Sequence, residues 1–172
     1  MPAVRRGLTI SIFSIFLALA FAACGGDDDS SSDSGGETTS AASSASPAEV
    51  GKTKPEVVVQ GGAPVQTLEK NDLVVGTGKE AKAGDEITVE YVGVGQKSKK
   101  EFDTSWGGEP LVFGLGSGLV IPGWEEGIPG MKVGGRRELV IPGELAYGPE
   151  GSPPEIGPNE TLIFVVDMLN VE

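Results

Sequence analysis

Short apolar segments separated by glycine and proline fill the second half of the chain, from about residue 66 onward. In residues 87–91, apolar or aromatic side chains alternate with polar ones. A period of two predicts a strand with one buried face. Glycine and proline recur too often here for long helices to form. The pattern therefore predicts a small domain made mainly of strands.

The remaining elements of this domain follow from the same reasoning. Further strands are predicted at residues 73–75, 100–102, 111–113, 136–141 and 162–169. A helix is indicated only at residues 123–127, and because Pro122 and Pro129 bound it, it has a turn or two at most. These elements predict an α+β fold with an antiparallel sheet wrapped around one short helix.

Composition separates this domain from the sequence before it. Residues 25–54 are rich in Gly, Ser, Thr, Ala and Asp and contain almost no large apolar side chains. Such a segment cannot bury enough surface to offset the entropy of ordering it, so a flexible tether is predicted. About 30 residues of this composition give a root-mean-square reach of roughly 30 Å.

The boundary between tether and domain is less sharply marked. Residues 57–59 are three valines that could form an edge strand, but Gly61, Gly62 and Pro64 interrupt them. We place the tether at residues 24–56 and the domain at 57–172, with its core from about residue 66.

The first 23 residues have the layout of a secretory signal peptide. Arg5 and Arg6 precede an apolar run over residues 8–23, which ends in small residues. A transmembrane helix needs about 20 apolar residues, and this run is shorter. Cleavage and export are therefore predicted.

The single cysteine of the chain follows this run directly. Residues 21–24, Phe-Ala-Ala-Cys, resemble the bacterial lipobox, in which the cysteine is lipid-modified and becomes the first mature residue, although Phe21 stands where the pattern usually has Leu. The alternative is a free thiol, because one cysteine cannot form a disulfide within its chain. We expect lipidation of Cys24 and an extracytoplasmic location, anchored to the cell membrane of a bacterium.

Net charge excludes one class of partner. The chain carries −12 at pH 7, and loss of Arg5 and Arg6 with the signal leaves 11 basic against 25 acidic residues, or −14. This charge disfavours nucleic acid and repels anionic lipid surfaces. Membrane contact is expected through the lipid anchor alone, and the domain is expected to be a monomer.

Five motifs in colinear order carry a resemblance to a known family. They are VEYVG at 89–93, KEFDTSW at 100–106, FGLGSGLVIPGWEEGIPGM at 113–131, LVIPGELAYG at 139–148 and TLIFVVDMLNV at 161–171. Together they cover about 100 residues and closely resemble the FKBP family of peptidyl-prolyl cis-trans isomerases. The resemblance implies a five- or six-stranded antiparallel half-barrel around the short helix, with a shallow apolar pocket between them.

The resemblance also implies which residues form the site. Those carried over are Tyr91, Phe102, Asp103, Phe113, Val120, Ile121, Trp124, Tyr147, Ile156 and Phe164. Trp124 would form the floor, the Ile121 N–H and the Tyr147 hydroxyl would bind substrate carbonyls, and Tyr91 would orient Asp103. Leu111 stands where many members have an aromatic residue, and Ser152 where some have His. Both departures are expected to alter substrate or inhibitor preference.

These residue types suit the rotation of an X-Pro bond. The barrier of roughly 18 to 20 kcal/mol reflects lost amide resonance, and no bond is broken. An apolar cup that favours the less polar twisted amide, with hydrogen bonds to the flanking carbonyls, is sufficient. No cofactor or metal is expected. The expected partners are proline-containing peptides and unfolded exported proteins, with macrolides as possible inhibitors.

Simpler interpretations remain for the same residues. The aromatic side chains could be ordinary core, and Asp103 could be a turn former. Gly114, Gly116 and Gly118 imitate a phosphate loop, but no lysine is placed for phosphates, so turn glycines are favoured. At the level of function, the alternatives are a non-catalytic proline-peptide-binding chaperone module and a structural surface lipoprotein.

Overall fold

The computed structural model describes residues 47–172. The predicted signal peptide, Cys24 and the tether up to residue 46 lie outside the described residues. The described part begins with a short 3-10 helix, η1 (Pro47–Glu49).

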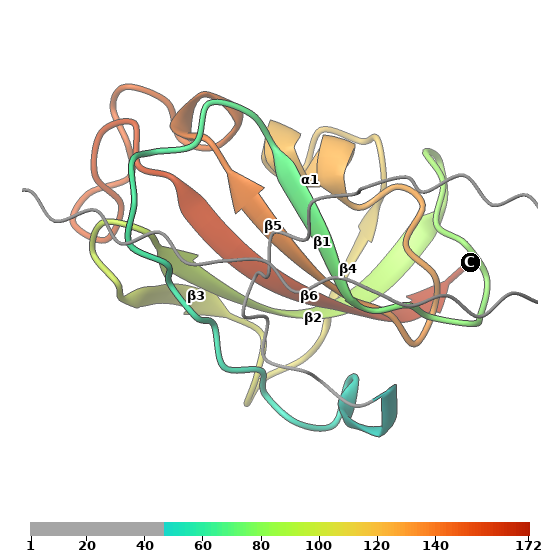
Figure 1. Cartoon of the computed structure of the whole chain (residues 1–172). Helices are drawn as coiled ribbons and strands as arrows, with labels where there is room; N and C mark the ends of the chain where they lie inside the picture. Colours follow the sequence, from blue (N-terminus) through green and yellow to red (C-terminus); the bar gives the residue numbers. More distant parts are fainter. Residues whose placement is uncertain (1–46) are drawn as a thin grey trace, which may run out of the picture. The chain divides into compact units, whose positions relative to one another are not determined.

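A six-stranded antiparallel sheet forms the body of the domain (Figure 1). Its strands are β1 (Glu69–Val74), β2 (Glu86–Gly95), β3 (Glu101–Thr104), β4 (Leu111–Gly114), β5 (Arg136–Ile141) and β6 (Leu162–Val171). The order is β1-β5-β6-β2-β3, and β4 also pairs with β2. One edge of β2 is therefore shared: β4 pairs with residues 86–89 and β3 with residues 92–94.

A single α-helix among the described residues, α1 (Pro122–Gly127), packs against β5. Close approach is possible because Gly123 and Gly127 face the strand. A Cβ on Gly127 would lie 2.8 Å from Cδ2 of Leu139, which is closer than side-chain atoms pack. A 3-10 turn, η2 (Gly143–Leu145), follows β5. The predicted α+β fold with one short helix is thus confirmed.

The core lies between the sheet and α1. Ile87 and Val89, the buried positions of the predicted alternation, are fully buried there, together with Leu139, Val166 and Met168. Neighbouring positions on the strands point to the other side of the sheet. This outer face is apolar as well. Val92 pairs with Val165 there, and the two side chains are only 2% and 1% exposed.

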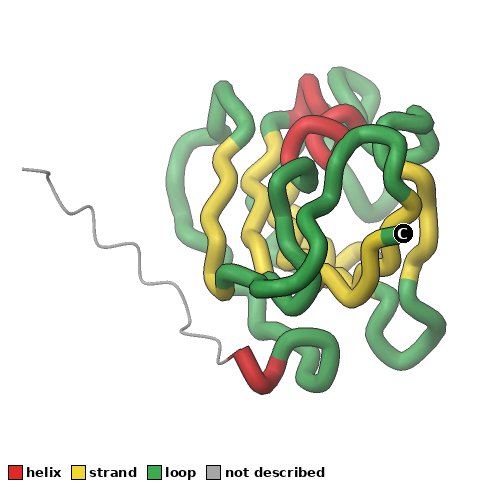
Figure 2. Tube along the Cα trace, turned by 90° about the vertical axis from the view of Figure 1, so that its right-hand side faces the viewer, coloured by secondary structure: helices red, strands yellow, loops and turns green. Residues whose placement is uncertain are grey.

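Residues 47–59, called the N-terminal strap from here on, bind the outer side of the sheet. The Gly51 N–H donates to Oδ2 of Asp167 at 2.6 Å, and Nη2 of Arg136 donates to the Thr53 carbonyl at 3.0 Å. In both views η1 and α1 lie on opposite sides of the sheet (Figures 1 and 2). Part of the segment assigned to the tether therefore contacts the domain. Composition does not reveal this because the strap uses backbone groups for its contacts with Arg136 and Asp167.

Candidate functional site

A cavity of ≈ 400 Å³ opens between α1, the middle of the sheet and two loops. Its lining residues are Tyr91, Asp103, Leu111, Leu119, Val120, Ile121, Trp124, Tyr147 and Phe164. They come from β2, β3, β4, the segment before α1, α1 itself, the loop after η2 and β6. Most are aromatic or aliphatic, so the cavity suits a small apolar ring.

Trp124 forms the floor of this cavity and is 3% exposed. Its ring lies 5.1 Å from that of Tyr91 and 5.2 Å from that of Phe164, each at 86°. Edge-to-face contacts of this kind are favourable, and they restrict the rotation of all three rings. Phe113 adds a fourth ring, 5.9 Å from Trp124. The floor is therefore preformed.

Tyr91 and Asp103 form one wall of the cavity and are hydrogen-bonded. The Tyr91 hydroxyl donates to Oδ2 of Asp103 at 2.7 Å. Burial, followed by the hydrogen bond and the charge of Asp103, raises the pKa of Tyr91 above its ordinary value. The phenol therefore remains a protonated donor at neutral pH, and it holds the carboxylate in one orientation.

Two polar groups at the rim have no hydrogen-bond partner among residues 47–172: the Ile121 N–H and the Tyr147 hydroxyl. Ile121 is extended, with φ −59° and ψ 149°, as expected before a proline. Its carbonyl accepts the Trp124 N–H at 2.9 Å, which leaves only the N–H available. Tyr147 is 43% exposed. A carbonyl placed at the rim can accept a bond from either group.

The side chain of Glu125 binds the loop before α1 through two hydrogen bonds. Its Oε2 accepts the Gly116 N–H at 2.5 Å, and its Oε1 accepts the Gly118 N–H at 2.8 Å. Both glycines have positive φ, +90° and +72°, which favours glycine at these positions. The Gly116 and Gly118 amides, which belong to the glycine pattern that imitates a phosphate loop, therefore bind the carboxylate of Glu125. Their effect is to fix Leu119, Val120 and Ile121 at the cavity.

The structure brings seven of the ten predicted site residues to this cavity. The other three, Phe102, Phe113 and Ile156, pack behind its lining. Phe102 contacts Phe164 edge-on, with ring centroids 5.5 Å apart. These three support the walls without facing the space inside.

Leu119 lines the cavity but was not among the predicted residues. It is 76% exposed, and an exposed leucine in a glycine-rich loop gives no periodic pattern to detect. Its position two residues before Ile121 is the only sequence clue. Leu111 lies at the cavity, whereas Ser152 does not line it and pairs with Ile156 in a short bridge.

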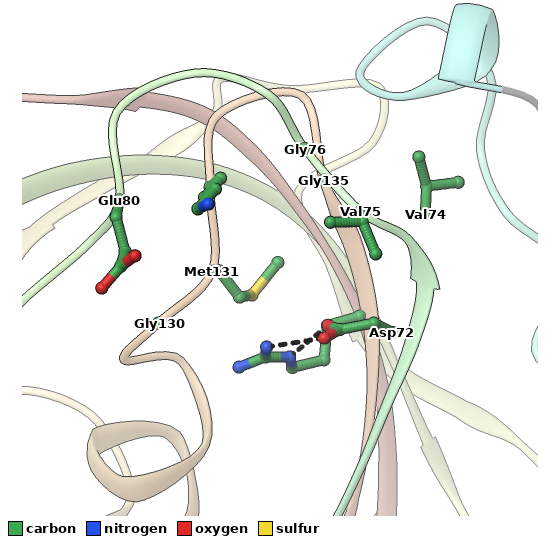
Figure 3. Close-up of a pocket in the computed structure, with 10 residues that line it drawn as sticks. Asp72, Val74, Val75, Gly76, Glu80, Gly130, Met131 and Gly135 are labelled. Carbon is green, nitrogen blue, oxygen red and sulfur yellow. Dashed lines mark hydrogen bonds and ion pairs between the residues drawn. The ribbon is translucent and has the colours of Figure 1, made fainter. Parts of the chain in front are cut away.

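A second cavity, of ≈ 290 Å³, lies near the end of β1 (Figure 3). Two of its charged side chains are bound to each other: Nε and Nη2 of Arg137 donate to Asp72, and Nη1 of Arg137 donates to the carbonyls of Gly127 and Pro129. Arg137 thus binds carbonyls at the end of α1, which would otherwise lack donors. This cluster supports α1 and, through it, Trp124.

No group of three or more His, Cys, Asp or Glu side chains in residues 47–172 could hold a metal ion. No helix in that range is long and apolar enough to cross a membrane.

Comparisons with known proteins identify the family of the domain. Residues 77–169 match a family described as FKBP-type peptidyl-prolyl cis-trans isomerase. An FK506-binding protein of Streptomyces anulatus is 52% identical over 120 residues, covering 69% of this chain and 97% of the relative.

Two solved structures are also similar. FkpA from Escherichia coli is 46% identical with a TM-score of 0.55, over 61% of this chain and 48% of FkpA, so the match spans about half of that protein. AtFKBP13 is 39% identical with a TM-score of 0.57, over 63% of this chain and 96% of its own.

Proposed function

The chain belongs to the FKBP-type peptidyl-prolyl cis-trans isomerases, and we propose that it acts outside the cytoplasm on exported protein chains, anchored through lipid on Cys24. The observation that carries the catalytic part is the combination of an aromatic floor with two unpartnered polar groups at its rim. The export and anchoring parts rest on the sequence before residue 25.

The cavity acts on the substrate by binding it without covalent chemistry. Rotation of an X-Pro bond is slow, tens to hundreds of seconds uncatalysed, because the twisted amide loses resonance. A proline ring seated on Trp124 places that amide in an apolar space. The twisted amide is less polar than the planar one, so such a space favours it.

The rim groups hold carbonyls of the peptide while the X-Pro bond rotates. The Ile121 N–H is fixed by the loop that Glu125 binds, and the Tyr147 hydroxyl can rotate to meet a carbonyl. Carbonyls fixed on one side of the bond let the other side turn. Asp103, held by Tyr91, places its negative charge beside the bound amide.

Macrolides of the FK506 type are proposed as inhibitors. The Streptomyces relative is named for binding FK506, and this chain matches 97% of it. Leu111 lies at the cavity of this chain. Because an aliphatic side chain offers less flat contact than an aromatic one, we expect weaker inhibition than in members with an aromatic residue there.

A single-tryptophan variant separates catalysis from binding alone. Trp106→Phe leaves Trp124 as the only tryptophan of the chain, so its fluorescence reports on the cavity floor. We expect a saturable response to an X-Pro tetrapeptide together with acceleration in a protease-coupled assay. A saturable response without acceleration would replace the isomerase by a non-catalytic proline-peptide-binding module.

The anchor requires a separate experiment in a bacterial host. Full-length chain and its Cys24→Ala variant are expressed, and detergent-phase partitioning and the mass of the mature N-terminus are measured. We expect the parent to enter the detergent phase with a lipid-sized mass on Cys24, and the variant to remain in the aqueous phase. Equal partitioning of both would contradict the anchor and leave the isomerase function untouched.

A further inference from the structure

Strand β2 changes its partner at Tyr91. β4 pairs with residues 86–89 of this edge and β3 with residues 92–94, so Tyr91 lies in the gap between them. Backbone groups left unpaired in a protein interior are costly. Here two side-chain hydroxyls bind the backbone of Tyr91: the Tyr91 N–H donates to Oγ of Ser105 at 2.9 Å, and Oγ1 of Thr104 donates to the Tyr91 carbonyl at 2.8 Å.

Ser105 is held in turn by Glu90. Only 9% of Ser105 is exposed, and its hydroxyl accepts from Tyr91 while donating to Oε2 of Glu90. The Ser105 N–H adds a bond to the Tyr91 carbonyl at 3.2 Å. The hydroxyl uses its donor and an acceptor site at the same time, which no apolar side chain could do.

The same segment fixes Asp103. The Thr104 N–H donates to Oδ1 of Asp103 at 2.9 Å, and the Tyr91 hydroxyl donates to Oδ2 at 2.7 Å. Both carboxylate oxygens are therefore occupied, one by the backbone of the 104–105 segment and one by the ring of Tyr91. The Trp106 N–H closes the turn on Oγ1 of Thr104 at 3.2 Å.

We propose that Ser105, Thr104 and Glu90 are positioning residues for the isomerisation, because they hold Tyr91 against Asp103 directly beyond the last pair of β2 and β3, Val92 with Thr104. None of the three lines the cavity. The inference rests on the isomerase function given above. It predicts that loss of a hydroxyl outside the pocket lowers turnover by displacing a pair inside it.

Kinetics of four variants of the full chain form the first test. Ser105→Ala and Thr104→Ala are expected to lower kcat/KM for an X-Pro tetrapeptide about tenfold, since small displacements of site groups are costly. Ser105→Thr retains the hydroxyl and should recover most of the activity. Thr77→Ala is the control, because Thr77 is exposed and lies away from the cavity. Assays run well below the melting temperature of each variant.

The pH at which Tyr91 ionises gives a second measurement, which would not change if Ser105 only stabilised the fold. The chain has two tyrosines, so a Tyr147→Phe background labelled with ¹³C at the tyrosine Cζ gives one signal, that of Tyr91. Burial and Asp103 raise the pKa of this phenol, so the signal should remain that of the protonated form at a pH where an ordinary tyrosine, with a pKa of about 10, is ionised. Ser105→Ala should lower the pH at which Tyr91 ionises, and Ser105→Thr should not.

The outcomes separate the possibilities. Lower kcat/KM with earlier ionisation of Tyr91, both reversed by Ser105→Thr, would support the inference. A lower melting temperature with unchanged kcat/KM and unchanged ionisation would overturn it, because Ser105 would then serve stability alone. Absence of isomerisation in the parent chain would overturn the function itself. That result is recognisable because Tyr91 ionisation would still respond to Ser105→Ala.

Discussion

Arg136 and Asp167 form a two-point ion pair on the outer side of the sheet, with Nε to Oδ1 at 2.6 Å and Nη2 to Oδ2 at 2.7 Å. Their side chains are 4% and 1% exposed. The backbone of the N-terminal strap supplies the remaining bonds of the pair, from the Gly51 N–H and to the carbonyls of Thr53 and Glu49. The ion pair and the strap therefore depend on each other.

Removal of one charge from this pair should strongly destabilise the fold. Asp167→Ala leaves Arg136 buried without its counter-ion, which typically costs about 3 to 5 kcal/mol in the free energy of unfolding. Urea unfolding followed by far-UV circular dichroism measures this. Replacement of both residues together, by Met and Leu, should cost clearly less because no unpaired charge remains.

An exposed pair of the same strap is the matched control. Lys54 lies 2.8 Å from Glu101, and both side chains are about two-fifths exposed, 42% and 41%. Lys54→Ala should change stability by under about 1 kcal/mol. If Asp167→Ala proved as mild as Lys54→Ala, the strap would not depend on the buried pair.

Substitutions of Glu125 and Glu126, neighbours on α1, test whether Glu125 holds the loop that carries Ile121 at the cavity rim. Glu125→Ala removes the acceptor for the Gly116 and Gly118 amides, so the loop carrying Ile121 should loosen. We expect kcat/KM for a prolyl peptide to fall by about tenfold. Steady-state kinetics of Glu126→Ala provide the comparison, because Glu126 is exposed on the same helix. Equal effects of the two substitutions would contradict a role for Glu125 in the rim.

The fold and much of the site could be predicted from the sequence, for physical reasons that particular residues illustrate. Residues 87–91 alternate strictly, and Ile87 and Val89 are buried as the period requires. Pro122 and Pro129 limit the helix, which ends at Gly127. The aromatic floor followed from a family resemblance, since periodicity alone does not distinguish a core ring from a cavity ring.

The remainder depends on contacts between segments distant in sequence. Phe102 and Phe113 have the residue types of a pocket, but their rings pack behind Phe164 and Trp124. The strap is bound through backbone atoms at Gly51 and Thr53, which leave no apolar pattern. The gap in the β2 edge at Tyr91 follows from strand pairing, and the alternation around it continues without interruption.

Acid should destabilise the domain in part through Glu160. Burial acts to raise the pKa of this carboxyl, but N–H groups of Ser98 at 3.0 Å and Gly157 at 2.7 Å outweigh it and lower the pKa below 4.5. A lowered folded-state pKa gives stability that is present above the unfolded value and is lost as pH falls through the folded value. Stability should therefore fall below about pH 4.5.

Glu160→Gln should remove this part of the pH dependence. Urea midpoints measured between about pH 3 and about pH 7 would decrease less steeply in the variant than in the parent. Glu155→Gln, at an exposed position of the same loop, should leave the slope unchanged. If the urea midpoints of Glu160→Gln fell with pH as steeply as those of the parent, groups other than Glu160 would govern the acid sensitivity.

The most direct measurement of the catalytic claim is NMR exchange spectroscopy on an X-Pro tetrapeptide with full-length protein. We predict that substoichiometric protein raises the cis-trans exchange rate well above that of the peptide alone. Tyr147→Phe should reduce the increase about tenfold, while Trp124 fluorescence, measured in the Trp106→Phe background, still responds to the peptide. An exchange rate equal to that of free peptide, at concentrations where the fluorescence response saturates, would contradict the account.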